Sequence, residues 1–261
     1  MTYIKRDLEP KIISLSREYS VILITGPGQV GKTTVLRQLM QKDRTYVTLD
    51  DLEERALARK DPALFLQMHD RPILIDEIHY APQLFSYIKI EVDNGAEPGS
   101  FWLTGSQAFR MMELAQESLA GRVALLHMPS LSQHEIYGSG NTSPFSIDLN
   151  ALKERAKTHA PADLQEIYQR IWKGSMPGFI SGRFSDRDVF YSSYLQTYIE
   201  RDVSELVNLT DKFIFRDFIR AAACRIGQLL NEYYGAAEPP VRCGESHLSG
   251  LTEPPTDSYS A

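Results

Sequence analysis

Short apolar runs alternate with helix-like segments through the first half of the chain. Five of these runs stand out: VILIT (21–25), TYVTL (45–49), PILID (72–76), FWLTG (101–105) and VALLHM (123–128). Continuous apolar runs of this length are typical of strands that are buried on both faces of a parallel sheet. Because the runs alternate with helical patterns, the sequence predicts an α/β layered domain.

Helical patterns flank the apolar runs on both sides. Ile4, Leu8, Ile12 and Leu15 recur at spacings that place them on one helical face, which predicts an N-terminal helix before the first run. After residue 146 the apolar runs stop, and three later segments have helical patterns: 163–172, 188–206 and 211–231. We expect these segments to form a small all-helical lid domain behind the sheet.

Two stretches of different composition divide the chain. GSGNTSPFS (138–146) is rich in turn-forming residues and predicts a linker. From Tyr233 onward the chain has two Pro-Pro pairs, many small polar residues and no period, which predicts disorder. The expected organisation is an α/β core over 1–137, a linker over 138–160, a helical lid over 161–232 and a disordered tail over 233–261.

A glycine-rich loop follows the first apolar run directly. Residues 26–33 (GPGQVGKT) match the pattern G-x-x-x-x-G-K-[ST], which holds the phosphates of a nucleoside triphosphate. Its glycines let the backbone turn tightly, so that successive N–H groups point at phosphate oxygens, and the helix that follows favours the same anion at its N-terminus. We expect Lys32 to reach the β- and γ-phosphates and Thr33 to bind Mg²⁺. The expected nucleotide contacts are Gly26, Pro27, Gly28, Gln29, Val30, Gly31, Lys32, Thr33 and Thr34.

An acidic pair ends the third apolar run. Asp76 stands where a carboxylate at the end of a strand reaches the Mg²⁺ shell, and Glu77 follows at once. Along an extended segment the Glu77 side chain points the other way, where it is placed to polarise an attacking water as a general base. The run at 45–49 lies between the loop's strand and the acidic strand. An inserted strand and a Glu beside the Mg-binding Asp resemble the ATPase branch of P-loop proteins, which favours ATP hydrolysis.

Polar residues after the fourth run and before the fifth run are further candidates. LTGSQ (103–107) ends the fourth run at the edge that faces the ligand crevice of a parallel sheet. Ser106 or Gln107 is a candidate for contacting the γ-phosphate or the attacking water, and Thr104 is a third. Arg122 precedes the fifth run, where an arginine of an oligomeric ATPase reaches the γ-phosphate of the neighbouring subunit. A surface or ion-pairing arginine is the alternative.

Two stretches of the lid segment have weaker signals. GSMPGF (174–179) predicts a tight loop, which is either a helix–helix turn or a contact with the nucleotide base. Glu200, Arg201 and Asp202 lie among apolar residues, and we expect them to form an ion-pair network that supports the structure.

Composition and charge narrow the class of protein. The net charge of −6 and the pI near 5.6 give no overall basic field, so charge does not support a nucleic-acid partner. No apolar run approaches the roughly 18 residues that span a bilayer. Cys224 and Cys243 form no metal-ligand spacing and no disulfide framework, which favours a reducing compartment. We expect a cytoplasmic protein without a membrane segment.

The motifs, taken in order, resemble one prokaryotic family of predicted AAA-superfamily ATPases. These ATP-binding proteins have a helical lid, a winged helix and a C-terminal nuclease-like domain of unknown function. The resemblance covers roughly residues 3–232 through VILITGPGQVGKTT, VTLDD, DPALFLQ, PILIDEIHYAPQLFSYIK, FWLTGSQ, ESLAGRVALLHMPSLSQHEI, GSMPGF, YLQTYIERDV and FIRAAACRIGQLLN.

The resemblance implies roles for individual residues and also shows departures. It implies nucleotide contacts at Gly26, Gly31, Lys32 and Thr33, a Mg²⁺ ligand at Asp76, a catalytic base at Glu77, a sensor at Ser106 and Gln107, and a finger at Arg122. The family usually has Arg at the position of Gly28, and Gly-Gly-x-Pro-Glu in place of GSMPGF. Because the chain turns proline-rich after GQLLN, the resemblance predicts a member that is truncated or frameshifted after about residue 232.

The sequence as a whole predicts a Mg-dependent ATP-binding protein that hydrolyses ATP to ADP and phosphate. The expected partners are ATP, further copies of the chain in a homo-oligomer, and a protein partner that the sequence does not identify. Three alternatives stay open: a regulatory switch with little turnover, a small-molecule kinase, and an inactive truncated fragment. An adjacent Glu77 speaks against the kinase.

Overall fold

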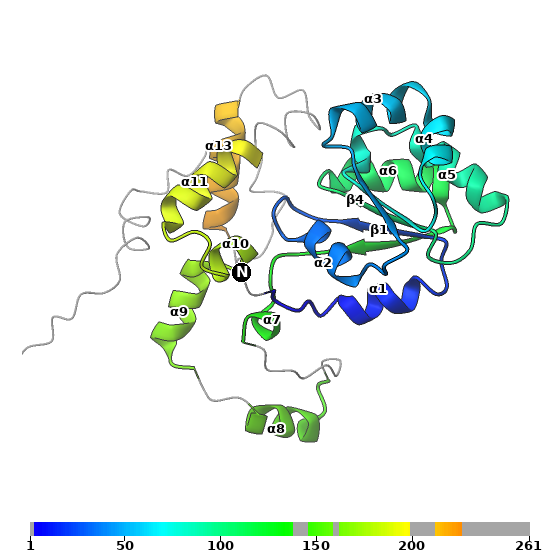
Figure 1. Ribbon diagram of the computed structural model, residues 1–261. Coiled ribbons are helices and arrows are strands. Elements are labelled where there is room, and N and C mark those ends of the chain that lie inside the picture. Colours follow the sequence, from blue (N-terminus) through cyan, green and yellow to red (C-terminus); the bar gives the residue numbers. More distant parts are fainter. Residues whose placement is uncertain (1–2, 138–145, 159–161, 199–211, 226–261) are drawn as a thin grey trace, which may run out of the picture.

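The computed structural model describes residues 3–137, 146–158, 162–198 and 212–225 of the 261-residue chain. Figure 1 shows an α/β core next to a group of helices formed by later residues. A five-stranded parallel sheet lies in the core, as the sequence predicts. Its strands are β1 (Val21–Thr25), β2 (Thr45–Thr48), β3 (Ile73–Asp76), β4 (Phe101–Gly105) and β5 (Val123–His127).

Alternate positions of each strand enter two separate hydrophobic cores, one on each face of the sheet. In β1, Val21 and Leu23 belong to one core, whereas Ile22 and Ile24 belong to the other. This follows because successive side chains of a strand point to opposite faces. All four side chains are completely buried. Burial on both faces explains why these strands are continuous apolar runs rather than alternating ones.

Helices cover both faces of the sheet (Figure 1). One core includes side chains of α3 (Leu52–Lys60), α4 (Pro62–Met68), α5 (Leu84–Asp93) and α6 (Ala108–Leu119). The other core includes Ile12 of α1 (Glu9–Leu15) and Val35 and Leu36 of α2 (Lys32–Leu39). The glycine-rich loop, which leads into α2, is therefore anchored between the sheet and a buried helix face.

Local signals set where several helices begin. The Asp51 carboxylate accepts hydrogen bonds from two N–H groups in the first turn of α3, and Asp61 accepts one at the start of α4. Pro10 and Pro62 stand in the first turns of α1 and α4, where the missing proline N–H would have no partner within the helix. The N-terminal helix therefore begins at Glu9, later than the apolar spacing from Ile4 predicts.

The order of the strands in the sheet is β2-β3-β4-β1-β5. A strand is inserted between β1 and β3, as expected, but it is β4 and not the run at 45–49. That run forms β2, which lies beyond β3 at the edge of the sheet. The sequence shows which runs are strands, whereas the crossovers decide which strands are neighbours. Because all the strands are parallel, the carboxyl ends of β1, β3 and β4 lie on the same side of the sheet. We call this row of strand ends one edge of the sheet, and the row of strand starts the opposite edge.

Helices follow β5 through the rest of the described chain. They are α7 (Gln133–Tyr137), α8 (Leu149–Thr158), α9 (Leu164–Lys173), α10 (Pro177–Ile180), α11 (Arg187–Tyr198) and α13 (Lys212–Cys224). α9, α11 and α13 fall within or beside the three segments with helical patterns, whereas residues 199–211 and 226–231 lie outside the described residues. α8 lies within the range predicted to be a linker, because Asp148 caps a segment of good helix formers by accepting from the Ala151 N–H at 2.9 Å.

The later helices contact the core through a few buried groups. Met176 and Phe190 are 8% and 7% exposed, and both belong to the core that includes α1 and α2. Leu131, just after β5, donates its N–H to the Ser175 carbonyl at 2.9 Å. The helical segment therefore packs near the loop side of the sheet.

The described part of the chain contains one of the two cysteines, Cys224. Cys224 is disulfide-bonded, so the expectation of unpaired cysteines is wrong at this position. Cys243 and the expected disordered tail lie outside the described residues.

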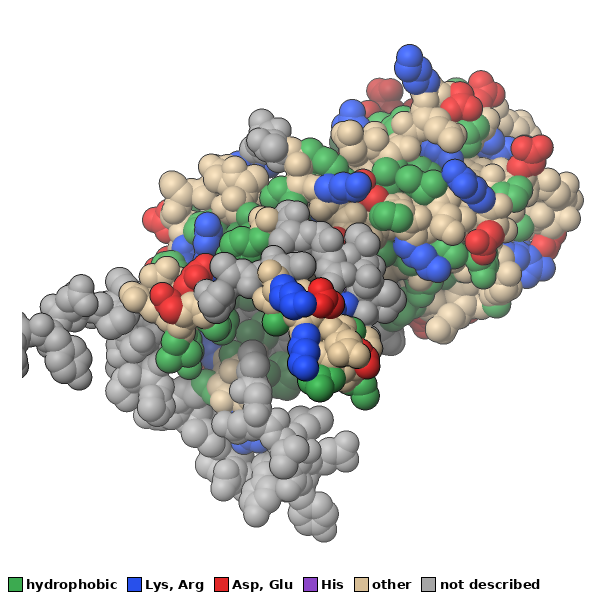
Figure 2. Space-filling view, turned by 90° about the horizontal axis from the view of Figure 1, so that it is seen from below, with side chains coloured by type: hydrophobic (Ala, Val, Ile, Leu, Met, Phe, Trp, Pro, Cys, Tyr) green, Lys and Arg blue, Asp and Glu red, His purple; other side chains and the backbone are tan. Residues whose placement is uncertain are grey.

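Charges of both signs are mixed on the surface. Figure 2 shows Lys and Arg side chains interspersed with Asp and Glu over the described part of the face seen from below, with no stripe of one sign there.

Candidate functional site

The glycine-rich loop connects β1 to α2 through left-handed backbone conformations. Gly26, Gln29 and Gly31 have φ angles of 144°, 63° and 95°. A Cβ at Gly26 would meet the Met128 carbonyl oxygen at 2.2 Å, so close packing as well as φ requires glycine there. A Cβ at Gly28 would meet nothing within 4 Å, so packing does not explain why this chain departs from the usual arginine.

Lys32 is the first residue of α2, and its ammonium group lies over the loop. Its Nζ donates hydrogen bonds to the carbonyl oxygens of Gly26 and Pro27, both at 2.9 Å. The residue is 5% exposed. A buried ammonium held at the loop by neutral carbonyls is placed to exchange them for phosphate oxygens, which are stronger acceptors because they carry charge. Thr34, the third residue of α2, is exposed.

Three hydroxyl groups converge on the Asp76 carboxylate at the end of β3. Thr33 Oγ1 donates to its two oxygens at 2.8 and 3.0 Å, and the Tyr46 hydroxyl donates to Oδ2 at 3.1 Å. Thr104 Oγ1 donates to Oδ1 in a short contact. Thr33 and Asp76, the two predicted Mg²⁺ ligands, are therefore in direct contact although 43 positions separate them in the chain.

The Tyr46 hydroxyl is held as a donor by its surroundings. Burial, followed by the charge of the Asp76 carboxylate, raises the pKa of Tyr46 above its ordinary value. The hydroxyl therefore keeps its proton at neutral pH and fixes one oxygen of the carboxylate. β2 contributes to the site through this residue.

Glu77 leaves β3 in the left-handed region, with φ 55° and ψ 44°. Its side chain therefore does not follow the extended alternation that the sequence predicts. Glu77 Oε2 accepts from the Ser106 N–H at 3.2 Å. It also lies 3.0 Å from His79 Nδ1, within ion-pair distance but without hydrogen-bond alignment.

The pKa of Glu77 is set by opposing influences. Burial, the largest of them, raises the pKa, whereas His79, Lys32 and the Ser106 N–H lower it. Together the lowering influences prevail, and the pKa of Glu77 lies below its ordinary value. Glu77 is therefore ionised at neutral pH, as a general base must be.

The end of β4 supports both acids. Thr104, completely buried, contacts Asp76 through its hydroxyl, and Ser106 contacts Glu77 through its backbone N–H. Ser106 Oγ is buried and makes no hydrogen bond. Gln107 is 2% exposed and stands at the start of α6. Of the three sensor candidates, Thr104 and Ser106 are thus tied directly to the acidic pair.

Arg122 lies away from the glycine-rich loop and the acidic pair of its own chain. It precedes β5, and β5 runs parallel to β1, so Arg122 lies at the sheet edge opposite the glycine-rich loop. Its Nε lies 2.5 Å from Asp93 Oδ1, and its side chain is 37% exposed. Within its own subunit Arg122 therefore makes the ion pair that was the alternative to a finger. A finger role would require the site of a second copy.

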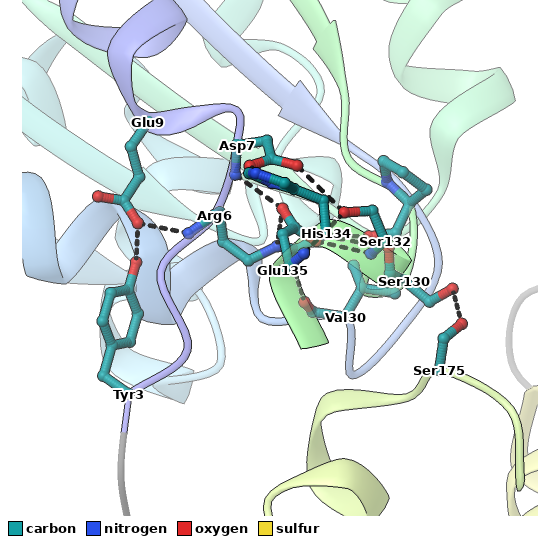
Figure 3. A network of polar contacts seen from close by, with 11 residues as sticks. Tyr3, Arg6, Asp7, Glu9, Val30, Ser130, Ser132, His134, Glu135 and Ser175 are labelled. Atoms are coloured by element: carbon teal, nitrogen blue, oxygen red, sulfur yellow. Dashed lines mark hydrogen bonds and ion pairs between the residues drawn. The ribbon is translucent and has the colours of Figure 1, made fainter. Parts of the chain in front are cut away.

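A buried arginine from the N-terminal segment supports the glycine-rich loop (Figure 3). Arg6 is 4% exposed and donates from Nη1 to the Val30 carbonyl at 2.8 Å and from Nη2 to the Pro129 carbonyl at 2.8 Å. Its Nε forms an ion pair of 2.9 Å with Glu135 of α7, whose side chain is 5% exposed. This guanidinium joins the loop, the segment after β5 and α7.

The same network reaches the helical segment. Ser130 Oγ and Ser175 Oγ are 2.7 Å apart, and Ser175 belongs to the GSMPGF stretch. Next to it, Met176 is buried against the core. The stretch therefore connects core and helices. Glu200, Arg201 and Asp202 lie outside the described residues.

Sequence reasoning did not single out Tyr46, His79 or Arg6. His79 follows Glu77 by two positions and is a polar ring among apolar neighbours, which is a usable signal. Tyr46 contacts Asp76 because β2 pairs with β3, and Arg6 contacts groups 24 and 129 positions away. These contacts depend on sheet order and chain crossing, and nothing local predicts them.

The oxygen donors suit a hard divalent cation. Mg²⁺ prefers oxygen ligands and takes most of its shell from water and phosphate oxygens, so one hydroxyl and one carboxylate are an adequate protein contribution. Thr33 and Asp76 supply that pair. Among the described residues, no group of three or more His, Cys, Asp or Glu side chains has the geometry to hold a metal.

Two parts of the chain match protein-family models. Residues 18–137 match the model of AAA_14, which is described as an AAA domain. Residues 164–233 match DUF8612, which is described as a domain of unknown function. The boundary between the two matches falls within the segment that separates the sheet from the later helices.

Two mycobacterial proteins are similar to most of the chain. The uncharacterized proteins Rv2008c of Mycobacterium tuberculosis and Mb2031c of Mycobacterium bovis are each 30% identical to it over 205 residues. The match covers 77% of this chain but 40% of each relative, so the chain spans less than half the length of these relatives.

A solved structure shares the fold. The chain is similar to the Walker-type ATPase PABY2304 of Pyrococcus abyssi, with a TM-score of 0.51 and 15% identity over 95% of this chain and 88% of that one. Residues 18–137 therefore match the model of an AAA domain, and the sheet that they form has the fold of that ATPase. In the part of the chain that the structure describes, helices fall short of the length and apolar character needed to cross a membrane.

Proposed function

We propose that the chain binds ATP with Mg²⁺ and hydrolyses it to ADP and phosphate. The observation that carries this proposal is the contact between Thr33 of the glycine-rich loop and Asp76 of β3, with Glu77 next in the chain. The residues that we propose as phosphate loop, cation ligands and base thereby lie together where β1 and β3 end. The AAA domain match supports ATP as the nucleotide.

The loop and Lys32 would bind the phosphates. The first N–H groups of α2 have no carbonyl partner within the helix and point towards the loop, where an anion would accept from them. Lys32 Nζ would leave the carbonyls of Gly26 and Pro27 and donate to the β- and γ-phosphates. Gly26 allows the loop to pass close to Met128 and still face the nucleotide.

Thr33 and Asp76 would hold Mg²⁺, which when bound neutralises charge on the β- and γ-phosphate oxygens. Tyr46 and Thr104 fix the orientation of the Asp76 carboxylate by donating to its two oxygens. On cation binding, Thr33 would turn its hydroxyl lone pair to the metal instead of donating its proton to Asp76.

Glu77 would act on the attacking water. Because it is ionised at neutral pH, its carboxylate can take a proton from water as the water oxygen attacks the γ-phosphorus and the bond to the β,γ-bridging oxygen breaks. Ser106 and His79 hold Oε2 of that carboxylate, so these two residues position the base.

The same contacts favour a second candidate, a switch that binds ATP with little turnover. Glu77 is held by His79 and the Ser106 N–H, and turnover would be low if these contacts kept its carboxylate away from the attacking water. The helical segment, which we propose acts as a lid over 161–232, contacts the core through Ser175. A nucleotide-dependent lid position would then be the output.

Phosphate release from Mg-ATP, measured at several protein concentrations, distinguishes the two functions. Wild type is compared with Glu77→Gln and with Glu113→Gln, an exposed glutamate of α6 that serves as the matched control. We expect Glu77→Gln to lower turnover by about 100-fold or more, the usual contribution of a general base, while calorimetry shows unchanged ATP affinity.

Each other outcome has a definite meaning. ATP binding without turnover in wild type would favour the switch. Turnover that is equal in wild type and Glu77→Gln would remove Glu77 as the base. If the wild type does not bind ATP, the proposed function is wrong.

A further inference from the structure

A cavity of about 880 Å³ lies at the sheet edge opposite the glycine-rich loop. It is formed where β2, β3 and β4 begin, beside the end of α1 and the connection from α5 to β4. Its lining includes Ser16, Arg17, Arg44, Arg71, Gly99 and Trp102. Because the strands are parallel and the loop is at their other ends, this cavity is separate from the nucleotide site.

Arg44 brings a buried positive charge to the cavity wall. It is 6% exposed, and its guanidinium carbon lies 3.9 Å from the centroid of the Trp102 ring. Nη1 donates to the Ile73 carbonyl at a long 3.3 Å, and Nε makes no hydrogen bond. No carboxylate of the described chain lies within ion-pair distance of Arg44. A guanidinium has five N–H donors, so much of its capacity is unused.

Burial of the Arg44 guanidinium disfavours its charged form. Burial lowers the pKa of Arg44 to about 10, and the neighbouring Asp43 offsets only part of the effect. Arg44 is still charged at neutral pH. A buried charge is unfavourable unless a counter-ion and hydrogen bonds satisfy it, and an anion from outside the chain would supply both.

The wall beside Arg44 is rigid and open. Trp102 is 4% exposed, and its indole N–H donates to Ser16 Oγ at 2.8 Å, which fixes the ring. Gly99 has φ 77°, and a Cβ there would lie 2.8 Å from the Ser16 carbonyl oxygen and 3.7 Å from Arg44 Nη2. The absence of a side chain at Gly99 therefore keeps space next to the guanidinium.

The charges around the rim limit the kind of anion. Arg71 is already paired with Glu91 at 2.8 Å, and Arg17, Asp43 and Glu97 are exposed. The rim thus carries both signs, and its carboxylates would repel a polyanion or a dianion more than a monoanion. A single negative charge matches the charge of Arg44.

We propose that this cavity binds a small organic carboxylate. The planar carboxylate would accept hydrogen bonds from the forked guanidinium of Arg44, a geometry in which arginine and carboxylate groups fit as a pair. The apolar part of the ligand would lie along Trp102 and Leu39. The proposal is independent of what occupies the nucleotide site.

Fluorescence of Trp102 tests the proposal. The chain has two tryptophans, so Trp172→Phe leaves Trp102 as the single reporter in the full-length protein. The probe is cyclohexanecarboxylate, which does not absorb at the excitation wavelength. Its amide, cyclohexanecarboxamide, is the uncharged control, and inorganic phosphate at equal ionic strength is the dianion control. We expect a saturable change with the carboxylate and none with the amide.

Variants of Arg44 in the Trp172→Phe background complete the test. Arg44→Met should weaken carboxylate binding at least tenfold, Arg44→Lys should weaken it less, and Lys11→Met, on the exposed side of α1, should leave it unchanged. Arg44→Lys also keeps the test decisive if Arg44→Met fails to fold. The proposal is overturned if the carboxylate gives no fluorescence change, or if phosphate binds more tightly than the carboxylate. It is also overturned if Arg44→Lys and Arg44→Met bind the carboxylate as tightly as the parent does.

Discussion

At the residue scale, the backbone conformation of Glu77 decides what its carboxylate contacts. The left-handed φ of 55° turns the chain directly after β3, so Glu77 meets the Ser106 N–H and His79 instead of continuing the strand. A non-glycine residue in this conformation is uncommon and costs free energy, and such residues concentrate at functional sites. The position of Glu77 is thus maintained by its surroundings rather than by its own preference.

A pH profile tests how His79 influences Glu77. The pKa of Glu77 is lowered in the folded protein, so the ionised base is present above the ordinary glutamate value and is lost only as the pH falls through the lower folded value. His79→Leu removes one of the groups that lower the pKa of Glu77, whereas the burial that raises it remains. The pKa of Glu77 therefore rises. We expect the acidic limb of phosphate release to move to higher pH.

Phosphate release is measured from about pH 3 to pH 8, a range that begins below the ordinary glutamate value and ends above the ordinary histidine value. His69→Leu is the control, because His69 pairs with Glu54 away from the site. An acidic limb that stays in place in His79→Leu would show that His79 does not set the pKa of Glu77.

At the scale of elements, one buried guanidinium connects the N-terminal segment with the glycine-rich loop and with the chain between β5 and α7. Arg6 reaches the glycine-rich loop through Val30, the segment after β5 through Pro129 and α7 through Glu135. Its removal would leave the Glu135 side chain, 5% exposed, without its cation. A buried ion pair that loses one partner is strongly destabilised, because the other charge remains desolvated.

Arg6→Met should therefore lower the free energy of unfolding by about 3–5 kcal/mol. Denaturant unfolding of the full chain measures it, with Lys11→Met on the exposed side of α1 as a control expected to change by about 0.5 kcal/mol or less. The double variant Arg6→Met with Glu135→Gln should recover part of the loss, because the stranded charge is gone. An effect of Arg6→Met no larger than that of Lys11→Met would contradict the role of the network.

At the scale of the whole molecule, the parallel sheet separates Arg122 from the glycine-rich loop and the acidic pair of the same copy. The loop and the acidic pair stand where β1 and β3 end, whereas Arg122 stands where β5 begins. The same edge holds the Arg44 cavity. Arg122 acts on a nucleotide only if a second copy presents its loop to this edge, which makes any such activity a property of an assembly.

Mixing two inactive variants tests that arrangement. Arg122→Ala keeps its own nucleotide site, and Lys32→Met keeps its finger. We expect each to be at least tenfold slower than wild type in phosphate release, and their mixture to recover activity through sites shared between copies. The loss of the exposed Arg122–Asp93 ion pair should cost about 0–1 kcal/mol, so folding is maintained.

Lys89→Ala is the matched control, since Lys89 also pairs with Asp93, at 3.7 Å. If Arg122→Ala alone hydrolyses ATP at the wild-type rate at every protein concentration, the finger role is wrong. If the mixture stays inactive, Arg122 does not act between copies.

The sequence by itself determined the strands of the sheet and the position of the glycine-rich loop. Strands buried on both faces must be continuous apolar runs, so the strands at 21–25 and 101–105 could be placed to the residue. The loop at 26–33 and the acids at 76 and 77 are local motifs, because binding phosphate and ending a strand depend on residues close in the chain. Helix starts at Asp51 and Asp61 are local for the same reason.

Only the tertiary structure decided which of these elements meet. The insertion of β4 between β1 and β3, the contact of Tyr46 with Asp76 and the hold of Arg6 on Val30 all depend on crossovers and strand order. The separation of Arg122 from the loop depends on strand direction. Residues far apart in the chain come into contact because the helices must cover both apolar faces of the sheet, and this fixes which strands are neighbours. A local sequence pattern does not contain that information.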